Sequence, residues 1–81
     1  MHITVQFLTL FHTISGVEQE VLEVAVGTTI DQLSGILIQK YQNLPLKDEK
    51  TYFVIHGQIV TRDHVLAEGD KVQIFQLLAG G

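Results

Sequence analysis

The sequence predicts an α+β domain in which one main helix packs across one face of a mixed sheet of about four to five strands. Apolar and polar residues alternate near both ends of the chain, and a helical stripe with a capping signal lies between them. The 81 residues are enough for one domain and too few for two. Hydrophobic residues make up 46% and charged residues 17%, a balance typical of a chain that folds.

Two strands are predicted in the first third of the chain. Residues 3–7 alternate with the period of a half-buried strand, and a Ser-Gly turn signal follows at residues 15–16. Residues 17–26 carry a second strand pattern, so a hairpin is the economical arrangement. The core-facing residues would be Ile3, Val5 and Phe7 in the first strand, and either Val21 or Leu22, then Val24 and Val26, in the second.

The main helix is predicted to begin after Thr29. Thr29 and Gln32, three residues apart, fit a capping box, and Asp31 suits the positive end of the helix dipole. Asn43 and Pro45 are expected to end the helix, and residues 46–50 to form a polar connector. Its buried stripe would consist of Ile30, Leu33, Leu37 and Tyr41, widened by Ile36 and Ile38.

The second half of the chain is predicted to return to strands. Residues 52–55 are aromatic and β-branched, His56-Gly57 is typical of a tight turn, and residues 58–60 run back. After a turn at residues 68–70, residues 71–75 alternate, with Val72 and Ile74 facing inward. We expect the first and last strands to lie side by side at the centre of the sheet.

Composition excludes several classes of function. Without cysteine, the chain has no disulfide scaffold, zinc ribbon, iron–sulfur site or thiol nucleophile. Nine acidic residues against five basic ones leave no basic stripe for nucleic acid. No apolar run approaches the roughly 20 residues that cross a membrane, and the first residues lack the features of a secretion signal. We therefore expect a cytoplasmic protein with no nucleic-acid or membrane partner.

The charged and titratable residues suggest no catalytic or metal site of their own. Glu18 and Glu20 are expected to share a solvated face of the second strand, and Arg62 to pair with a nearby acid. No metal site is expected, because the spacing of the histidines matches no metal motif. The acids near Arg62 are Asp63, Glu68 and Asp70, and the histidines are His2, His12, His56 and His64.

The sequence ends in two glycines directly after the last predicted strand. We divide it into a domain, residues 1–75, and a flexible tail, residues 76–81. A tail without Cβ atoms at Gly80 and Gly81 can thread a narrow active-site tunnel, and the Gly81 carboxylate would then be the reacting group. A carboxylate needs activation, most simply adenylation with ATP. Taken alone, the two glycines favour the simpler interpretation, a frayed chain end or a remnant of cloning.

The carboxyl-terminal third, residues 59–62 and 68–81, resembles the ThiS/MoaD family of sulfur carriers, which are ubiquitin-like β-grasp proteins. Its discriminating part is the Gly69-Asp70 turn together with the terminal Gly-Gly. Residues 7–16 resemble the MoaD type, in which the first strand leads into a short helical turn. Residues 75–81 are more similar to ThiS, whereas the total length is closer to MoaD.

The resemblance implies a carrier rather than an enzyme. An E1-like enzyme would adenylate Gly81 with ATP, and a persulfide donor would convert it to a thiocarboxylate. The sulfur would then pass to an acceptor synthase, either a molybdopterin-synthase large subunit or a thiazole synthase. No cofactor would be stably bound, since the activating partner uses the ATP. The chain would be the small, non-catalytic subunit of any molybdopterin-synthase-like complex. The residues that thread the partner's active site would be Gly80, Ala79 and Leu78.

A partner-binding apolar surface is expected near the tail. It would consist of Phe75, Leu77, Leu8 and Leu10, although Phe75 capping the edge of the core is an equal alternative. Two other functions stay open. One is a ubiquitin-like modifier conjugated to lysine through Gly81, and the other is a β-grasp interaction module whose Gly-Gly end is incidental. Mutation of Gly81 would leave binding intact in the interaction module and abolish the function of either activated carrier.

Overall fold

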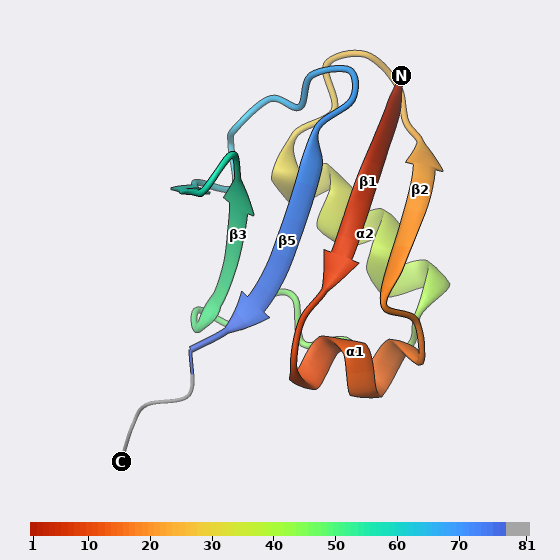
Figure 1. Cartoon of the computed structure of the whole chain (residues 1–81), viewed down its shortest axis with the longest axis vertical. Coiled ribbons are helices and arrows are strands. Elements are labelled where there is room, and N and C mark those ends of the chain that lie inside the picture. Colours follow the sequence, from red (N-terminus) through yellow and green to blue (C-terminus); the bar gives the residue numbers. More distant parts are fainter. Residues whose placement is uncertain (78–81) are drawn as a thin grey trace.

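The computed structural model describes residues 1–77, and five strands within this range form one mixed sheet in the order β2-β1-β5-β3-β4. Helix α2 lies across one face of the sheet, and the short helix α1 lies at the end where β1 finishes (Figure 1). The predicted α+β class is therefore confirmed. The elements are β1 His2–Phe7, α1 Leu10–Ser15, β2 Gln19–Glu23, α2 Ile30–Lys40, β3 Thr51–Ile55, β4 Gln58–Val60 and β5 Lys71–Gln76.

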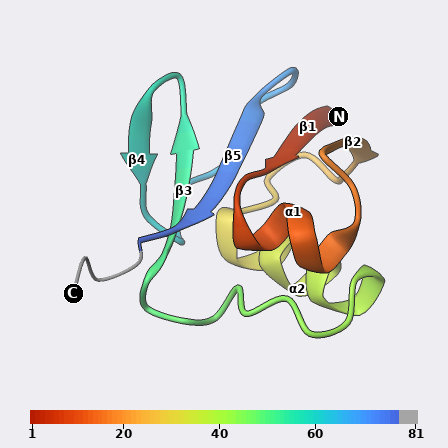
Figure 2. The same ribbon diagram turned by 60° about the horizontal axis from the view of Figure 1, so that its bottom comes forward.

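The first and last strands lie side by side at the centre of the sheet, as predicted. β1 runs parallel to β5, with Phe7 opposite Ile74, and antiparallel to β2. β5 is antiparallel to β3 on its other side, with Tyr52 opposite Phe75. Because β1 and β5 are parallel, both finish at the same end of the molecule. The connector, residues 41–50, reaches β3 at this same end (Figure 2).

The core lies between α2 and the sheet. Burial of alternate residues in β1 and β5 and of a helical stripe in α2 confirms these parts of the pattern. Ile36 was expected to widen the stripe, but its side chain is 42% exposed. It lies about 100° around the helix from Leu37, which turns it away from the sheet. The buried hydrophobic residues of these three elements are Ile3, Val5, Phe7, Ile30, Leu33, Leu37, Val72 and Ile74.

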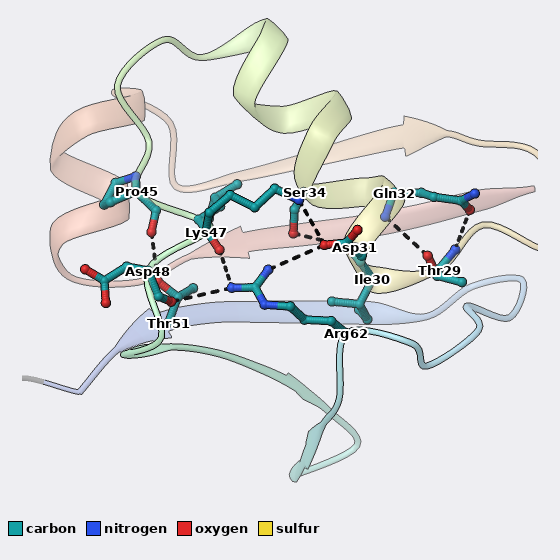
Figure 3. Close-up of polar contacts among 11 residues, drawn as sticks. Thr29, Ile30, Asp31, Gln32, Ser34, Pro45, Lys47, Asp48, Thr51 and Arg62 are labelled. Carbon is teal, nitrogen blue, oxygen red and sulfur yellow. Dashed lines mark hydrogen bonds and ion pairs between the residues drawn. The ribbon is translucent and has the colours of Figure 1, made fainter.

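The predicted capping box at the start of α2 is present (Figure 3). The backbone N–H of Gln32 donates to the Thr29 hydroxyl at 3.2 Å, and the N–H of Thr29 donates to the Gln32 side chain at 3.0 Å. Two backbone donors without a partner in the helix are thereby satisfied. The helix ends at Lys40, before the Asn43 and Pro45 that were expected to stop it.

The second strand is shorter than the predicted residues 17–26. Leu22 packs against the core and Val21 is 61% exposed, so Leu22 is the core-facing residue of the two. Val26 is also exposed, because the chain leaves the strand and turns at Gly27 with φ 93°. The prediction that residues 46–50 form a polar connector was wrong at Leu46, which is fully buried in the core.

No helix formed by residues 1–77 is long and apolar enough to cross a membrane.

Candidate functional site

The carboxyl-terminal segment leaves the sheet from a fixed point. Gln76, which the sequence assigned to the tail, is the last residue of β5 and lies opposite Thr51. The N–H of Leu77 donates to the carbonyl of Lys50 at 3.0 Å, so the residue after the strand is also held. Four predicted site residues lie outside the described residues and stay predictions: Leu78, Ala79, Gly80 and Gly81.

Leu8 and Phe75 lie next to each other on the sheet face that α2 leaves uncovered. The N–H of Leu8 donates to the carbonyl of Ile74 at 3.0 Å, which continues the β1–β5 ladder by one residue and sets Leu8 beside Phe75. On its other side Phe75 stacks on Tyr52, with ring centroids 5.8 Å apart and an interplanar angle of 27°. Leu8, Phe75 and Tyr52 form an apolar row that runs from the residue after β1 across β5 to β3.

The apolar row ends beside the point where Leu77 leaves the sheet. All three of its side chains are half-buried, whereas Leu77 is 51% exposed. The row therefore offers ring and aliphatic surface that a partner can cover, close to the carboxyl-terminal segment. Tyr52 was not among the predicted surface residues, because only the pairing of β3 with β5 brings it against Phe75.

Leu10 has a different position from the one expected. The prediction placed Leu8 and Leu10 together in one partner-binding surface, but β1 ends at Phe7 and Leu10 is the first residue of α1. Its side chain is 39% exposed. Leu8 lies in the link between β1 and α1, and the ladder brings only Leu8 alongside Phe75.

Glu20 of β2 has a structural role. Glu20 was expected to be solvated, but its side chain is only 17% exposed. Its carboxylate accepts a hydrogen bond from the Tyr41 hydroxyl at 2.5 Å and lies 2.6 Å from Lys40 Nζ. Burial raises the pKa of Tyr41 to about 12, with a further contribution from Glu20. Burial would also raise the pKa of Glu20, but hydrogen bonds from Lys40 and Tyr41 outweigh it and hold that pKa below its ordinary value.

A pocket of about 310 Å³ lies at the opposite end of the sheet from Leu77. His56, His64 and Asp70 are among its lining residues. Asp70 accepts a hydrogen bond from the N–H of Ala67 at 2.8 Å, and its second oxygen lies 3.7 Å from His56 Nε2. His56 and Gly57 have φ of 53° and 74°, which confirms the predicted tight turn. Within residues 1–77, no three acidic or histidine side chains are arranged to hold a metal ion.

Comparison with known proteins identifies the family. The model of the ThiS family matches residues 5–81. The chain belongs to the ThiS family. This family comprises ThiS/MoaD-like proteins of the ubiquitin fold that act as sulfur carriers or small modifiers, and the predicted resemblance is confirmed. The match includes the Gly-Gly end. No curated protein sequence matches the chain.

Solved structures show that the ThiS-family chain has the ubiquitin-like β-grasp fold. SAMP1 from Haloferax volcanii matches with a TM-score of 0.87 and 13% identity, each chain being covered completely. Molybdopterin converting factor subunit 1 from Pyrococcus furiosus matches with a TM-score of 0.82 and 21% identity, over 95% of this chain and 98% of that one. The BexX/CysO complex of Amycolatopsis orientalis contains a chain that matches with a TM-score of 0.73 and 18% identity, with 98% and 99% covered.

Proposed function

We propose that the chain is a sulfur carrier that reacts through the carboxylate of Gly81. The observation that supports this most directly is the family match, which runs through the last strand to Gly81. The carboxylate attacks the α-phosphate of ATP in the active site of an E1-like enzyme and forms an acyl-adenylate with release of pyrophosphate. A persulfide of the sulfur donor then attacks the acyl carbon and expels AMP, giving an acyl disulfide. A thiol cleaves this disulfide and leaves the thiocarboxylate.

In this proposal the chain supplies a docking surface and a carboxyl-terminal segment that starts from the anchored Leu77, and the partner supplies the catalytic groups. The apolar row gives the partner a surface to cover beside the anchored Leu77. Residues 78–81 span at most about 14 Å when extended, at roughly 3.5 Å for each residue. An active site that uses Gly81 must therefore come within this distance of the sheet end, and the apolar row lies at this end.

The partners in this proposal are the E1-like enzyme, the persulfide donor and an acceptor synthase. The chain binds no cofactor stably, and the activating enzyme consumes the ATP. A molybdopterin-type acceptor is the first to test, because the length and the α1 segment after β1 agree with the MoaD type. A thiazole synthase is the second, because residues 75–81 are more similar to ThiS.

The test is the intact mass of the protein after incubation with ATP, an E1-like enzyme and a persulfide donor. We expect a mass gain equal to the exchange of one oxygen atom for sulfur. The gain should be absent without ATP and in a variant that lacks Gly81. No gain with several E1-like enzymes, in a sample confirmed to end at Gly81, would refute the proposal.

Conjugation to lysine is the second candidate, because SAMP1, which has a similar fold, is a small archaeal modifier protein. The activated Gly81 would then react with a lysine amine to form an isopeptide bond and release AMP or the activating thiol. The same incubation with added cell proteins distinguishes the two. Conjugates that carry the chain on lysine indicate a modifier, whereas a free thiocarboxylate that accumulates alone indicates a carrier.

A further inference from the structure

Arg62 binds the backbone of the connector (Figure 3). Its guanidinium lies over the ring of Phe53, with Cζ 5.2 Å from the centroid. Nη2 donates to the carbonyl of Leu46 and lies 3.5 Å from the carbonyl of Asp48. Nη1 is 4.0 Å from a carboxylate oxygen of Asp31, and the side chain is 34% exposed. Arg62 was expected to pair with a neighbouring acid, and it instead holds a segment that lies at least 14 residues earlier in the chain.

The connector passes this restraint on to Lys50. The Asp48 carboxylate accepts a hydrogen bond from the N–H of Lys50 at 2.8 Å, and the Asp48 carbonyl accepts one from the N–H of Thr51 at 3.0 Å. The Thr51 hydroxyl donates to the carbonyl of Pro45 at 2.9 Å, which closes the connector on itself. Asp48 therefore holds Lys50 itself and Thr51, the residue that follows it.

Lys50 in turn holds Leu77, the residue that directly follows β5. Its carbonyl accepts the hydrogen bond from the N–H of Leu77 at 3.0 Å. A continuous path of contacts thus runs from Arg62 through Asp48 and Lys50 to Leu77. The path starts on β3, where Arg62 lies over Phe53, and ends at Leu77, directly after β5.

We propose that Arg62 is a positioning residue for the carboxyl-terminal reaction. By holding the connector it fixes the Lys50 carbonyl, and through Leu77 it sets where residues 78–81 begin. This inference rests on the proposed function. Loss of the Leu77 anchor moves the last fixed point back into β5, so fewer chain conformations bring Gly81 to the reacting geometry. Lysine cannot replace Arg62, because a single ammonium cannot reach two carbonyls and stack on Phe53 at once.

The first experiment measures the anchor itself, by amide hydrogen exchange of Leu77 relative to Val72 in the middle of β5. Arg62→Gln and Asp48→Ala should raise the relative exchange of Leu77 about tenfold, because each breaks the path at a different contact. Asp48→Asn keeps the oxygen that Lys50 uses and should restore protection. Lys47→Gln is the matched control. It removes the 2.9 Å ion pair with Asp31 from the same connector and leaves the path intact.

The second experiment measures adenylation by ATP–pyrophosphate exchange with a cognate E1-like enzyme. For Arg62→Gln we expect kcat to fall about five- to tenfold with KM within about twofold, because docking is unchanged and the productive geometry is rarer. Lys47→Gln should keep both constants. A role of Arg62 in stability alone would leave kcat unchanged at temperatures where both variants are folded.

The outcomes separate the two proposals. Unchanged exchange at Leu77 in Arg62→Gln and Asp48→Ala would overturn the anchoring path. Increased exchange with an unchanged kcat would overturn the role of Arg62 in positioning. A wild-type chain that is not adenylated would overturn the proposed function and the catalytic half of this inference, while the exchange data would still decide whether Arg62 holds Leu77.

Discussion

Tyr41→Phe removes one oxygen atom from the junction between α2 and β2 and leaves the ring against Phe7. The lost contact is the 2.5 Å hydrogen bond to the Glu20 carboxylate, whereas the edge-to-face contact with Phe7 at 5.5 Å remains. A hydrogen bond to a charged group contributes about 1.5–3 kcal/mol. Lys40 still pairs with the other carboxylate oxygen at 2.6 Å, so we expect the lower end, about 1.5 kcal/mol.

Urea unfolding at pH 7, followed by circular dichroism, measures this loss. The corresponding decrease in Tm is about 6–12 °C for a domain of this size. Tyr52→Phe is the control, since the Tyr52 hydroxyl makes no hydrogen bond within residues 1–77. A loss below about 0.5 kcal/mol for Tyr41→Phe, or an equal loss for Tyr52→Phe, would refute the reasoning from the Glu20 contact.

The contacts of Glu20 also predict how the stability of the folded state changes with pH. Burial opposes the charged form of Glu20, but the bonds from Lys40 and Tyr41 prevail and lower its folded pKa below the ordinary 4.5. A lowered carboxylate pKa stabilises the folded state above the ordinary value, and this contribution is lost as the pH falls through the folded pKa. The stability difference between wild type and Tyr41→Phe should therefore be constant near pH 7 and shrink below pH 4.5. A difference that grows on acidification would contradict this.

Two further predictions concern the docking surface and the start of α2. Phe75→Ser, and separately Leu8→Ser, should weaken binding of a cognate E1-like enzyme about tenfold in calorimetry, because each interrupts the apolar row. Leu10→Ser is the control, and equal weakening by it would show that docking extends over α1. Thr29→Ala should lower the free energy of unfolding by about 1 kcal/mol through loss of the capping box. Thr29→Ser keeps the hydroxyl and should restore most of this energy, so an equal loss in both variants would count against the cap.

Local patterns in the sequence predicted the elements that depend on neighbours in the chain. The capping box needs only Thr29 and Gln32, and the alternation in β1 and β5 reports burial at every second residue. The same patterns placed His56 and Gly57 in a turn. The central pairing of the first and last strands was also predicted correctly, but residue spacing alone does not fix it.

Contacts between distant segments could not be read in this way. The partners of Arg62 are backbone carbonyls, and nothing in the residue types at positions 46 and 48 marks them as acceptors. Glu20 is half-buried and pairs with Lys40 and Tyr41, which follow it by about 20 residues. Tyr52 joins the apolar row only through the pairing of β3 with β5. In each case the missing information is the spatial pairing of elements, which residue patterns do not encode.

The parallel pairing of β1 with β5 has a mechanical consequence. A partner that draws Gly81 into its active site pulls on β5 along the strand direction. β5 is hydrogen-bonded to β1 on one side and to β3 on the other, so such a force loads several hydrogen bonds together in shear. A strand at the edge of the sheet would share the same force with the hydrogen bonds of one neighbour only. The domain can therefore resist traction on its carboxyl-terminal end without unravelling from the strand that bears it.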